Sequence, residues 1–251
     1  MIVLVTGASA GFGAAMARSF MRHGHRVIAA ARRSERLAGL QQELGEALLP
    51  LTLDVTDPAA IDAALASLPA DWQAIDVLIN NAGLALGIAP AQRALLDDWL
   101  TMIDTNVRGL ATLTHAVLPR MMERNSGLII NVGSVAATTA YPGGNVYGAT
   151  KAFVAQFTRN LCADLVGTGV RATNLAPGLV GGTEFSNVRF HGDDAAAAKI
   201  YAGTVPLTPE DIAETAYWIA TLPPHVNISV LEMMPTCQGF GPMVIKRDLP
   251  Q

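Results

Sequence analysis

Three residues in the middle of the chain could together transfer a proton. Ser134 is followed thirteen residues later by Tyr147, and Lys151 comes four positions after the tyrosine. In a helix that begins near Asn145, residues 147 and 151 project from the same face. A tyrosine ordinarily titrates near pKa ~10, and a neighbouring ammonium group favours its phenolate. Tyr147 is therefore a candidate general acid/base, with Ser134 as a hydrogen-bond donor to a reacting oxygen. The ordinary alternative is a packed aromatic ring beside a solvated lysine.

A glycine-rich turn near the N-terminus has the layout of a phosphate-binding site. A buried strand is predicted over residues 2–5, and three glycines follow between Thr6 and Gly13, ahead of a helical pattern. Free N–H groups at the start of that helix, with the positive end of its dipole, would bind phosphate. The glycine spacing differs from G-x-G-x-x-G, and no Gly-Lys-Ser/Thr sequence suggests a P-loop. The alternative is an ordinary strand-to-helix turn, which rarely needs three glycines.

Arg32 and Arg33 follow the second predicted strand. In dinucleotide-binding folds an acidic residue about 20 positions after the glycine loop binds the adenosine ribose hydroxyls, whereas an arginine accommodates a 2′-phosphate. Forked guanidinium groups suit phosphate, so the sequence favours NADP over NAD. The alternative is that these are solvated arginines at the start of the next helix. This alternative is credible for one of the two arginines but less so for both.

Further polar or small residues follow the third and fourth predicted strands. Asp54 and Val55 come after the third, where Asp54 could accept a hydrogen bond from the adenine amino group and Val55 would lie beside the ring. Asn81, Ala82 and Gly83 come after the fourth. Small residues there would let the backbone pass close to a ribose; a turn that stabilises the sheet edge is the alternative.

These residues are positioned by an alternation of strands and helices that runs through the chain. Strands are predicted over residues 2–5, 26–31, 48–53, 77–79, 128–132, 170–175 and 228–233. The helices between them include a long one from Leu95 to Met122 and one from Asn145 to about Gly167. The pattern predicts an α/β fold, a single Rossmann-type domain over 1–251 with about seven parallel strands and helices on both faces. Because parallel strands end at one edge, the candidate residues converge there.

The stretch 179–206 lacks this pattern and is predicted to be a substrate lid or binding loop. It contains Arg189, the candidate partner for a substrate carboxylate; a surface arginine is the equal alternative. Asn106 lies within the long helix on or near its apolar side, so it is either a structural bridge or part of a polar site. The tail from Gly239 to Gln251 is irregular and could pack on a neighbouring subunit.

Composition excludes several classes of function. Of 251 residues, 51% are apolar and 15% charged, below the usual roughly 25% charged, which predicts a large core and wide subunit interfaces. A net charge of −4 argues against a nucleic-acid or acidic-membrane partner. Two cysteines, Cys162 and Cys237, are too few for a disulfide framework and suit a reducing cytosol. We find no targeting or membrane-spanning segment and no metal-ligand cluster, so a soluble cytoplasmic protein is expected.

Over essentially its whole length the sequence resembles the short-chain dehydrogenase/reductase family. The residues that carry the likeness are Thr6-Gly7, Gly11-Phe12-Gly13, Asn80-Asn81-Ala82-Gly83, Asn106, Ser134, Tyr147, Lys151 and Pro177-Gly178. Within the family it is similar to the bacterial NADP-dependent 3-hydroxy acid dehydrogenases that act on serine and related small acids, through stretches 144–153 and 178–190.

The resemblance implies a role for each matching residue. Tyr147 would be the catalytic acid/base, Ser134 would hold the substrate oxygen, and Asn106 would support a proton-relay water. Lys151 would bind the nicotinamide ribose and lower the tyrosine pKa. The expected cofactor contacts are Gly7, Ser9, Ala10, Gly11, Phe12, Gly13, Arg32, Arg33, Asp54, Val55, Asn81, Ala82, Gly83, Tyr147, Lys151, Pro177, Gly178, Val180 and Thr183. The family's usual threonine five residues after the proline is replaced by Gly182, so Thr183 is the substitute; Phe12 replaces a commoner isoleucine.

The function expected from these observations is reversible oxidation of the 3-hydroxyl of small 3-hydroxy acids, serine or 3-hydroxypropionate-like, with NADP. The reverse reaction would reduce a semialdehyde, and the family likeness implies a homo-tetramer. Substrate contacts are expected from Ser134, Tyr147 and Arg189. Two alternatives remain: an NADPH-dependent reductase of uncharged ketones or aldehydes, and a non-enzymatic NADP-binding sensor or scaffold.

Overall fold

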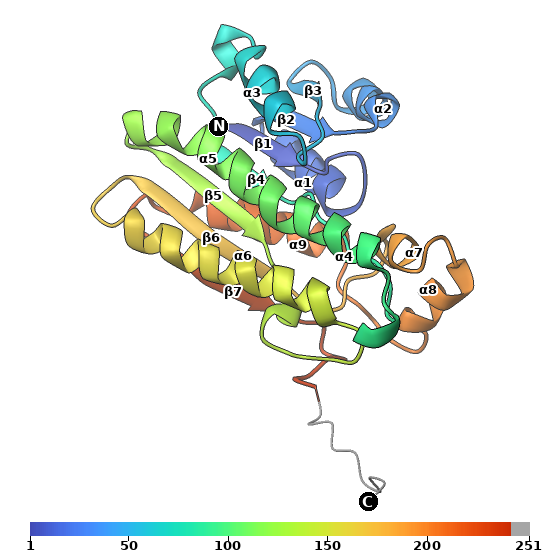
Figure 1. Ribbon diagram of the computed structural model, residues 1–251. Helices are drawn as coiled ribbons and strands as arrows, with labels where there is room; N and C mark the ends of the chain where they lie inside the picture. Colours follow the sequence, from blue (N-terminus) through green and yellow to red (C-terminus); the bar gives the residue numbers. More distant parts are fainter. Residues whose placement is uncertain (242–251) are drawn as a thin grey trace, which may run out of the picture.

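The computed structural model describes residues 1–241, in which seven parallel strands form one sheet. The strands are β1 (Ile2–Thr6), β2 (Arg26–Ala31), β3 (Leu48–Thr52), β4 (Val77–Asn80), β5 (Gly127–Val132), β6 (Val170–Pro177) and β7 (Val230–Met233). Their order across the sheet is β3-β2-β1-β4-β5-β6-β7 (Figure 1). The winding direction reverses between β1 and β4, the place where open α/β sheets bind ligands.

Helices cover both faces of the sheet (Figure 1). One face carries α1 (Gly11–Arg22), α2 (Ser34–Leu44) and α9 (Pro209–Thr221); the other carries α3 (Pro58–Ala66), α5 (Leu110–Glu123) and α6 (Asn145–Asp164). Successive strand residues alternate between the two cores: Val3 and Val5 pack with α1 and α9, whereas Leu4 packs with α3 and α5. Both sides of each central strand are therefore buried, which explains their unbroken apolar runs. The predicted fold is confirmed.

The predicted long helix from Leu95 to Met122 is divided in the structure. It consists of α4 (Leu96–Ile103), a π-helical turn η3 (Asp104–Gly109) and α5. Gly109, in this turn, lies so close to the loop after β3 that a Cβ atom there would come 2.8 Å from the Val55 carbonyl oxygen. Single π-helical turns inside α-helices often mark functional sites, and this one contains Asn106.

Segment 179–206 contains two short helices, α7 (Phe185–Arg189) and α8 (Asp194–Tyr201), where the sequence analysis expects an irregular connection. The buried Ser186 hydroxyl lies 2.6 Å from the Tyr201 hydroxyl and holds the two helices together. The Asp193 side chain caps α8 by accepting a hydrogen bond from the Ala196 N–H at 2.9 Å. Their lengths of five and eight residues leave too little periodicity to identify from sequence.

The remaining helical turns are η1 (Ala70–Trp72), η2 (Ala91–Arg93) and η4 (Val135–Ala137). The predicted tail is irregular as far as Gly241, and its possible packing on another subunit concerns residues that lie mainly outside the described part of the chain. Within residues 1–241 each helix is too short or too polar to cross a membrane.

Candidate active site

Tyr147 and Lys151 lie one turn apart at the start of α6, beside the residues that follow β5. Both side chains are buried, with 8% and 7% of their surfaces exposed. The Lys151 ammonium donates a hydrogen bond to the Val132 carbonyl oxygen at 2.8 Å and lies 5.9 Å from the centroid of the Tyr147 ring. Ser134 precedes η4, where its hydroxyl accepts a hydrogen bond from the Ala136 N–H at 3.1 Å. The end of β5 thus positions both serine and lysine against the tyrosine.

Burial raises the pKa of Tyr147 to about 12, although a hydrogen bond from Ser134 and the charge of Arg189 both oppose the rise. Burial also lowers the pKa of Lys151 to about 8, because an ammonium group loses hydration there. The chain's own groups therefore favour the neutral phenol, and the lower tyrosine pKa expected beside Lys151 stays a prediction. The neutral phenol is favoured because loss of hydration at this depth outweighs the hydrogen bond from Ser134 and the charge of Arg189.

Asn106 lies in the π-helical turn and is buried behind the tyrosine and lysine. Its amide exchanges two hydrogen bonds with the Leu84 backbone, at 2.9 and 2.8 Å, and donates a third to the Thr150 hydroxyl at 3.1 Å. Thr150 in turn donates to the Tyr147 carbonyl oxygen at 2.8 Å. Asn106 therefore connects the loop after β4 to α6, which combines the structural bridge and the polar site that the sequence left open. Thr150 is a member of this network that the sequence analysis missed.

The glycine loop forms an open cradle at the start of α1. Gly7 and Gly11 have positive φ angles of 66° and 51°, which favour glycine. No side chain caps the N-terminus of α1 at Ala10, so the amides of its first turn are available to an anion. Gly13 does not line the cavity; it packs against the Gly7 carbonyl group, and an added Cβ would clash with it. The loop thus fits a pyrophosphate, with Gly13 setting the approach of helix to strand.

Thr6 fixes the loop after β4 next to the glycine loop. Its hydroxyl accepts hydrogen bonds from the Asn81 and Ala82 N–H groups at 3.0 and 2.9 Å and donates to the Ile79 carbonyl oxygen at 3.2 Å. The Asn81 side chain donates back to the Thr6 carbonyl oxygen at 2.8 Å. Because β1 and β4 are neighbours, these bonds bring two motifs separated by about 75 residues to one edge.

Arg32, Arg33 and Asp54 form the far end of the same cavity. Arg33 donates from Nε and Nη2 to the Ser9 hydroxyl, at 3.2 and 3.1 Å, and from Nη1 to Glu184 at 2.9 Å. Arg32 forms no ion pair with another residue of the described chain. Asp54 accepts two hydrogen bonds from Thr56, which fix the orientation of its carboxylate. Two guanidinium groups and a hydroxyl suit a 2′-phosphate.

Arg189 projects from the end of α7 toward the catalytic end of the cavity. Its guanidinium carbon lies 5.8 Å from the centroid of the Tyr147 ring. Nη2 donates to the Tyr141 hydroxyl at 3.0 Å and Nε donates to the Gly87 carbonyl oxygen at 3.2 Å. Phe185, at the other end of the helix, meets the Tyr147 ring edge-on at 5.8 Å between centroids. Segment 179–206 therefore supplies a cation and an apolar wall beside the candidate acid/base.

One cavity of about 700 Å³ joins these groups. It is lined by every predicted site residue except Gly13 and Asn106, which lie behind it. The wall also contains residues that were not predicted, among them Tyr141, Glu184 and Phe185. Each lies in a stretch without clear periodicity, and no local motif singles it out. Within residues 1–241 no group of three or more His, Cys, Asp or Glu side chains is placed to hold a metal ion.

Comparison with known proteins agrees with this geometry. A family model described as short chain dehydrogenase matches residues 1–193. The chain is 61% identical, over 99% of its length and 100% of the relative's, to the NADP-dependent 3-hydroxy acid dehydrogenase YdfG of Salmonella typhi. It is 48% identical, over 98% of each chain, to the serine 3-dehydrogenase of Agrobacterium fabrum. Among solved structures, the closed form of a serine dehydrogenase complexed with NADP+ superposes with a TM-score of 0.98, at 60% identity over 99% of this chain and 100% of that one.

The doubly wound sheet and the cavity at its switch point define a dinucleotide-dependent oxidoreductase. The chain belongs to the short-chain dehydrogenase/reductase family. The family and the enzyme class predicted from the sequence are confirmed.

Proposed function

We propose that this enzyme reversibly oxidises the 3-hydroxyl group of small 3-hydroxy acids, such as serine or 3-hydroxypropionate, and in reverse reduces the corresponding semialdehydes. The observation that carries this proposal is the position of Arg189, whose guanidinium group lies 5.8 Å from the Tyr147 ring inside the cavity. A substrate with its hydroxyl at Tyr147 and Ser134 and a carboxylate a few bonds away could reach that cation. Relatives at 61% and 48% identity are named for 3-hydroxy acids and for serine.

NADP is the cofactor, as the sequence predicted, and curated relatives are named NADP-dependent. The residues present fit it: Arg32, Arg33 and Ser9 surround the place for a 2′-phosphate, and the uncapped start of α1 suits the pyrophosphate. The nicotinamide ring, when bound, accepts or gives the hydride. Lys151 and Asn81 to Gly83 line the route between the glycine loop and Tyr147.

The chain's own part in the chemistry is to hold and move one proton. In the reductive direction the neutral phenol of Tyr147, which burial favours, donates its proton to the carbonyl oxygen. In the oxidative direction the same oxygen must receive the substrate hydroxyl proton, so the phenolate has to form first. Ser134 and Arg189 both lower the tyrosine pKa toward that state. Ser134 also orients the reacting oxygen by a hydrogen bond.

Reduction of uncharged ketones and aldehydes is a second candidate function, favoured by the apolar side chains of Phe185, Val188 and Phe190 in the cavity wall. A substrate panel separates the two. We expect 3-hydroxypropionate and serine to be oxidised with NADP at a kcat/KM at least about tenfold above that of an uncharged alcohol of the same size, since a charge-assisted hydrogen bond contributes about 1.5–3 kcal/mol. Equal kcat/KM values, measured by NADPH absorbance, would assign the enzyme to uncharged substrates.

We further propose that segment 179–206 acts as a lid. It carries Arg189 and Phe185 over the catalytic end, and its Thr183 lies against Gly11, where a Cβ atom would come 3.4 Å from the threonine side chain. Substrate and cofactor would have to enter while these contacts are open. The long connection and short helices suit such motion.

A further inference from the structure

Helix α7 connects the two ends of the cavity. Glu184, the residue before it, contacts Arg33 and Arg36 near the 2′-phosphate site, and its last residue, Arg189, contacts Tyr141 near the catalytic tyrosine. The Val188 N–H donates a hydrogen bond to the Glu184 carbonyl oxygen at 2.9 Å, so Glu184 is tied to the last turn of this five-residue helix. A displacement of Glu184 would therefore be transmitted to Arg189.

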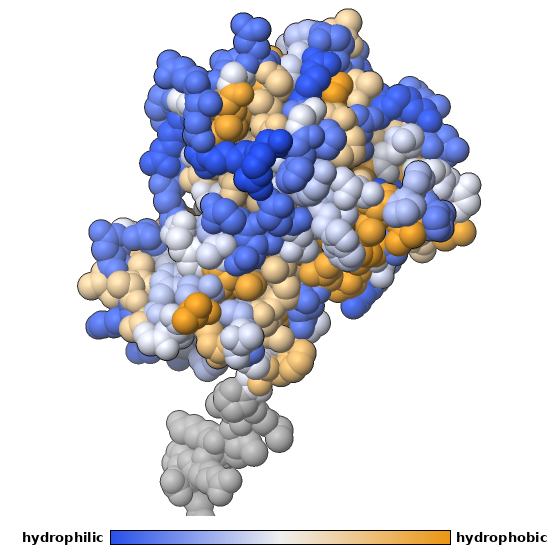
Figure 2. All heavy atoms as spheres, turned by 180° about the vertical axis from the view of Figure 1, so that it is seen from behind, coloured by the Kyte–Doolittle hydropathy of each residue, from blue (hydrophilic) through white to orange (hydrophobic). Residues whose placement is uncertain are grey.

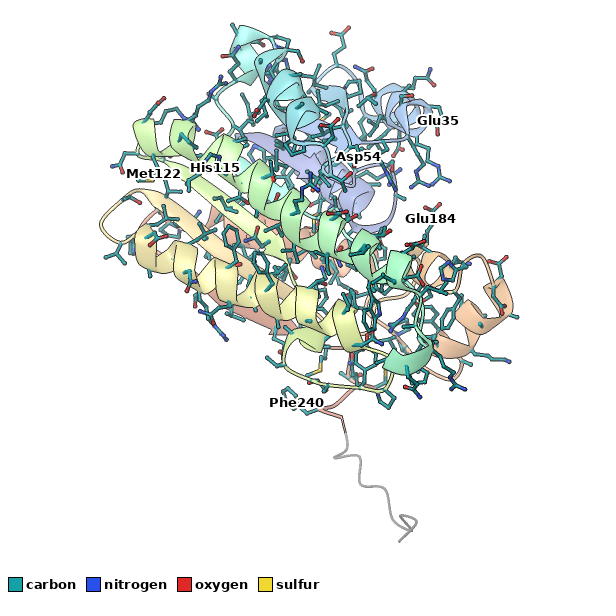
Figure 3. The ribbon with its side chains drawn as sticks, viewed as in Figure 1. Glu35, Asp54, His115, Met122, Glu184 and Phe240 are labelled. Carbon is teal, nitrogen blue, oxygen red and sulfur yellow. The ribbon has the colours of Figure 1, made fainter. Side chains whose placement is uncertain are left out.

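The carboxylate of Glu184 is held by two guanidinium groups, one on each oxygen. Arg33 donates to Oε2 at 2.9 Å and Arg36 donates to Oε1 at 2.6 Å. Figure 3 shows Glu184 between α7 and α2. Arg36 lies in the first turn of α2, and Arg33 directly precedes this helix. The three side chains are 39–45% exposed. Ion pairs this exposed add little stability on their own, so their effect depends on what else orders the arginines.

Arg33 is shared between the glycine loop and segment 179–206. Its Nε and Nη2 atoms point to Ser9, whereas Nη1 points to Glu184. The two sets of donors lie on different edges of one planar group, so an anion beside Ser9 and the carboxylate of Glu184 can be bound together. An anion beside Ser9 would immobilise Arg33 and reduce the entropy that Glu184 loses on pairing with it.

We propose that Glu184 is a positioning residue that links the 2′-phosphate of NADP, through Arg33, to the placement of Arg189. The 2′-phosphate, rather than a dinucleotide in general, then orders the substrate-binding end of segment 179–206. NADP would therefore strengthen substrate binding more than NAD does, in addition to binding more tightly itself. This inference rests on the proposed function only where it concerns the hydroxy acid.

Residues of α7 contact both the Gly87 backbone and the Tyr147 ring, so a movement of this helix would change both contacts. The Arg189 backbone carbonyl accepts a hydrogen bond from the Gly87 N–H at 2.9 Å, and its side chain donates to the Gly87 carbonyl at 3.2 Å. Phe185, on the same helix, packs on the Tyr147 ring. The charged groups that face Glu184 are Arg33 and Arg36, so loss of its charge weakens both attachments at once.

Hydrogen exchange of segment 179–206 tests the link without any substrate. We expect saturating NADP+ to slow the amides of α7 and α8 in the wild type at least about fivefold more than saturating NAD+ does, a coupling at the low end of typical values. In Glu184→Gln this difference should disappear, while the amides at the start of α1 stay equally protected by both cofactors. Equal protection by NADP+ and NAD+ in the wild type, or an unchanged difference in the variant, would overturn the proposal.

Kinetics give a second readout. In Glu184→Gln the KM for 3-hydroxypropionate with NADP should rise about fivefold or more, exceeding any fall in kcat, and approach the value with NAD. Glu43→Gln is the matched control: Glu43 forms an equally exposed pair with Arg18 away from the cavity and should change neither quantity. If no hydroxy acid is oxidised, the proposed substrate fails but the exchange result still decides the role of Glu184.

Discussion

The surroundings of Tyr147 include groups that raise its pKa and groups that lower it. Burial raises its pKa to about 12, whereas Ser134 and Arg189 lower it. Lys151, the cation that the sequence pairs with it, instead donates a hydrogen bond to the Val132 carbonyl oxygen. The ammonium and phenol therefore share a site without a direct hydrogen bond between them in the described structure. Burial therefore favours the neutral phenol, the form that can donate a proton.

Replacement of Tyr147 by phenylalanine tests its role directly. The ring that packs on Phe185 is kept and only the hydroxyl is lost. We expect turnover to fall by about 10²–10⁴-fold, the usual contribution of a positioned acid/base, while NADPH binding is unaffected. NADPH absorbance gives turnover and NADPH fluorescence titration gives binding. Tyr217→Phe, remote from the cavity, is the control; near-normal turnover in the Tyr147 variant would refute the assignment.

Arg189→Ala tests carboxylate recognition. Loss of one charge-assisted hydrogen bond should raise the KM for 3-hydroxypropionate by about 10–100-fold and leave the KM for an uncharged alcohol unaffected, whereas any loss of the effect of Arg189 on the tyrosine pKa lowers kcat for both. The uncharged alcohol also reports whether the cavity keeps its shape. Arg159→Ala, on the exposed side of α6, is the matched control. Unchanged kinetics on the carboxylate substrate would remove Arg189 from the site.

Lys151 makes stability depend on pH in a defined direction. Burial lowers its pKa from 10.5 to about 8, so between these values the unfolded chain binds more protons and stability rises with pH. Burial of Tyr147 raises that pKa from 10.0 to about 12, which lowers stability only above pH 10. Between pH 8 and 10 the wild type should therefore gain about 1–2 kcal/mol in unfolding free energy relative to Lys151→Met.

Urea denaturation of both proteins without added cofactor, at several pH values in that range, measures the difference. Lys199→Met, at an exposed position of α8, serves as the control for loss of a lysine charge. A difference between wild type and Lys151→Met that stays constant from pH 8 to pH 10 would contradict the assigned cause.

At the scale of the elements, the contact between α1 and the glycine loop decides whether the cradle forms. A Cβ atom on Gly13 would clash with the Gly7 carbonyl oxygen, and backbone cannot move aside as a flexible side chain does. Gly39, on the exposed face of α2, has open space around it. The two glycines therefore form a matched pair within neighbouring helices.

We expect Gly13→Ala to lower the free energy of unfolding by about 1–3 kcal/mol through overpacking, and to weaken NADPH binding. Gly39→Ala should instead stabilise the protein by roughly 0.5–1 kcal/mol, because alanine favours the helix more than glycine does. Urea unfolding and NADPH titration give both quantities. Normal stability and normal NADPH binding in Gly13→Ala would show that the close approach is not needed.

The π-helical turn and segment 179–206 show where local patterns stop being informative. Residues 95–122 have a nearly continuous helical pattern, yet η3 interrupts it where Gly109 packs on the Val55 loop. In segment 179–206 the helices are short and held by contacts such as that of Ser186 with Tyr201. In the first case a tertiary contact interrupts a helix that the local pattern predicts. In the second case a tertiary contact stabilises helices that the local pattern does not predict.

At the scale of the whole molecule, two of the apolar regions exposed within residues 1–241 are candidate contact surfaces between subunits. One lies on α4, where Leu96, Leu100 and Ile103 are 64%, 49% and 41% exposed. The other lies on the opposite face, where Trp218 of α9 and Val230 of the edge strand β7 are exposed. Figure 2 shows that face, on which hydrophobic residues lie among hydrophilic ones in the upper part and are also present in the middle and lower parts. Closed tetramers need more than one kind of contact surface, and these regions could supply two.

We therefore expect a tetramer, with four times the 26.3 kDa mass of one chain, in light scattering after size-exclusion chromatography. Leu100→Asp should reduce the mass, because a charge would be buried in an apolar contact. Val166→Asp, 80% exposed at the end of α6, is the control and should leave the mass unchanged. A monomer in the wild type would overturn the expectation.

The residues that act together were predictable because each follows a strand. Strand positions follow from apolar runs, and parallel strands must end at one edge, so Asn81, Ser134 and the glycine loop could be placed together without coordinates. The family resemblance added the proton-relay role of Asn106 and the roles of the other side chains. NADP was predicted from Arg32 and Arg33, because arginine side chains carry the positive charge that binds a 2′-phosphate.

The sequence by itself determined the sheet and favoured NADP, because these depend on periodicity, glycine positions and residue types that act locally. The class of enzyme followed from the family resemblance. Only the tertiary structure decided that Tyr147 is buried, which favours its neutral phenol, that Glu184 pairs with Arg33, and that Arg189 points into the cavity. A pKa depends on the depth of burial and on charges from distant segments. Glu184 lies 151 positions from Arg33. Such effects exist only once the chain has folded.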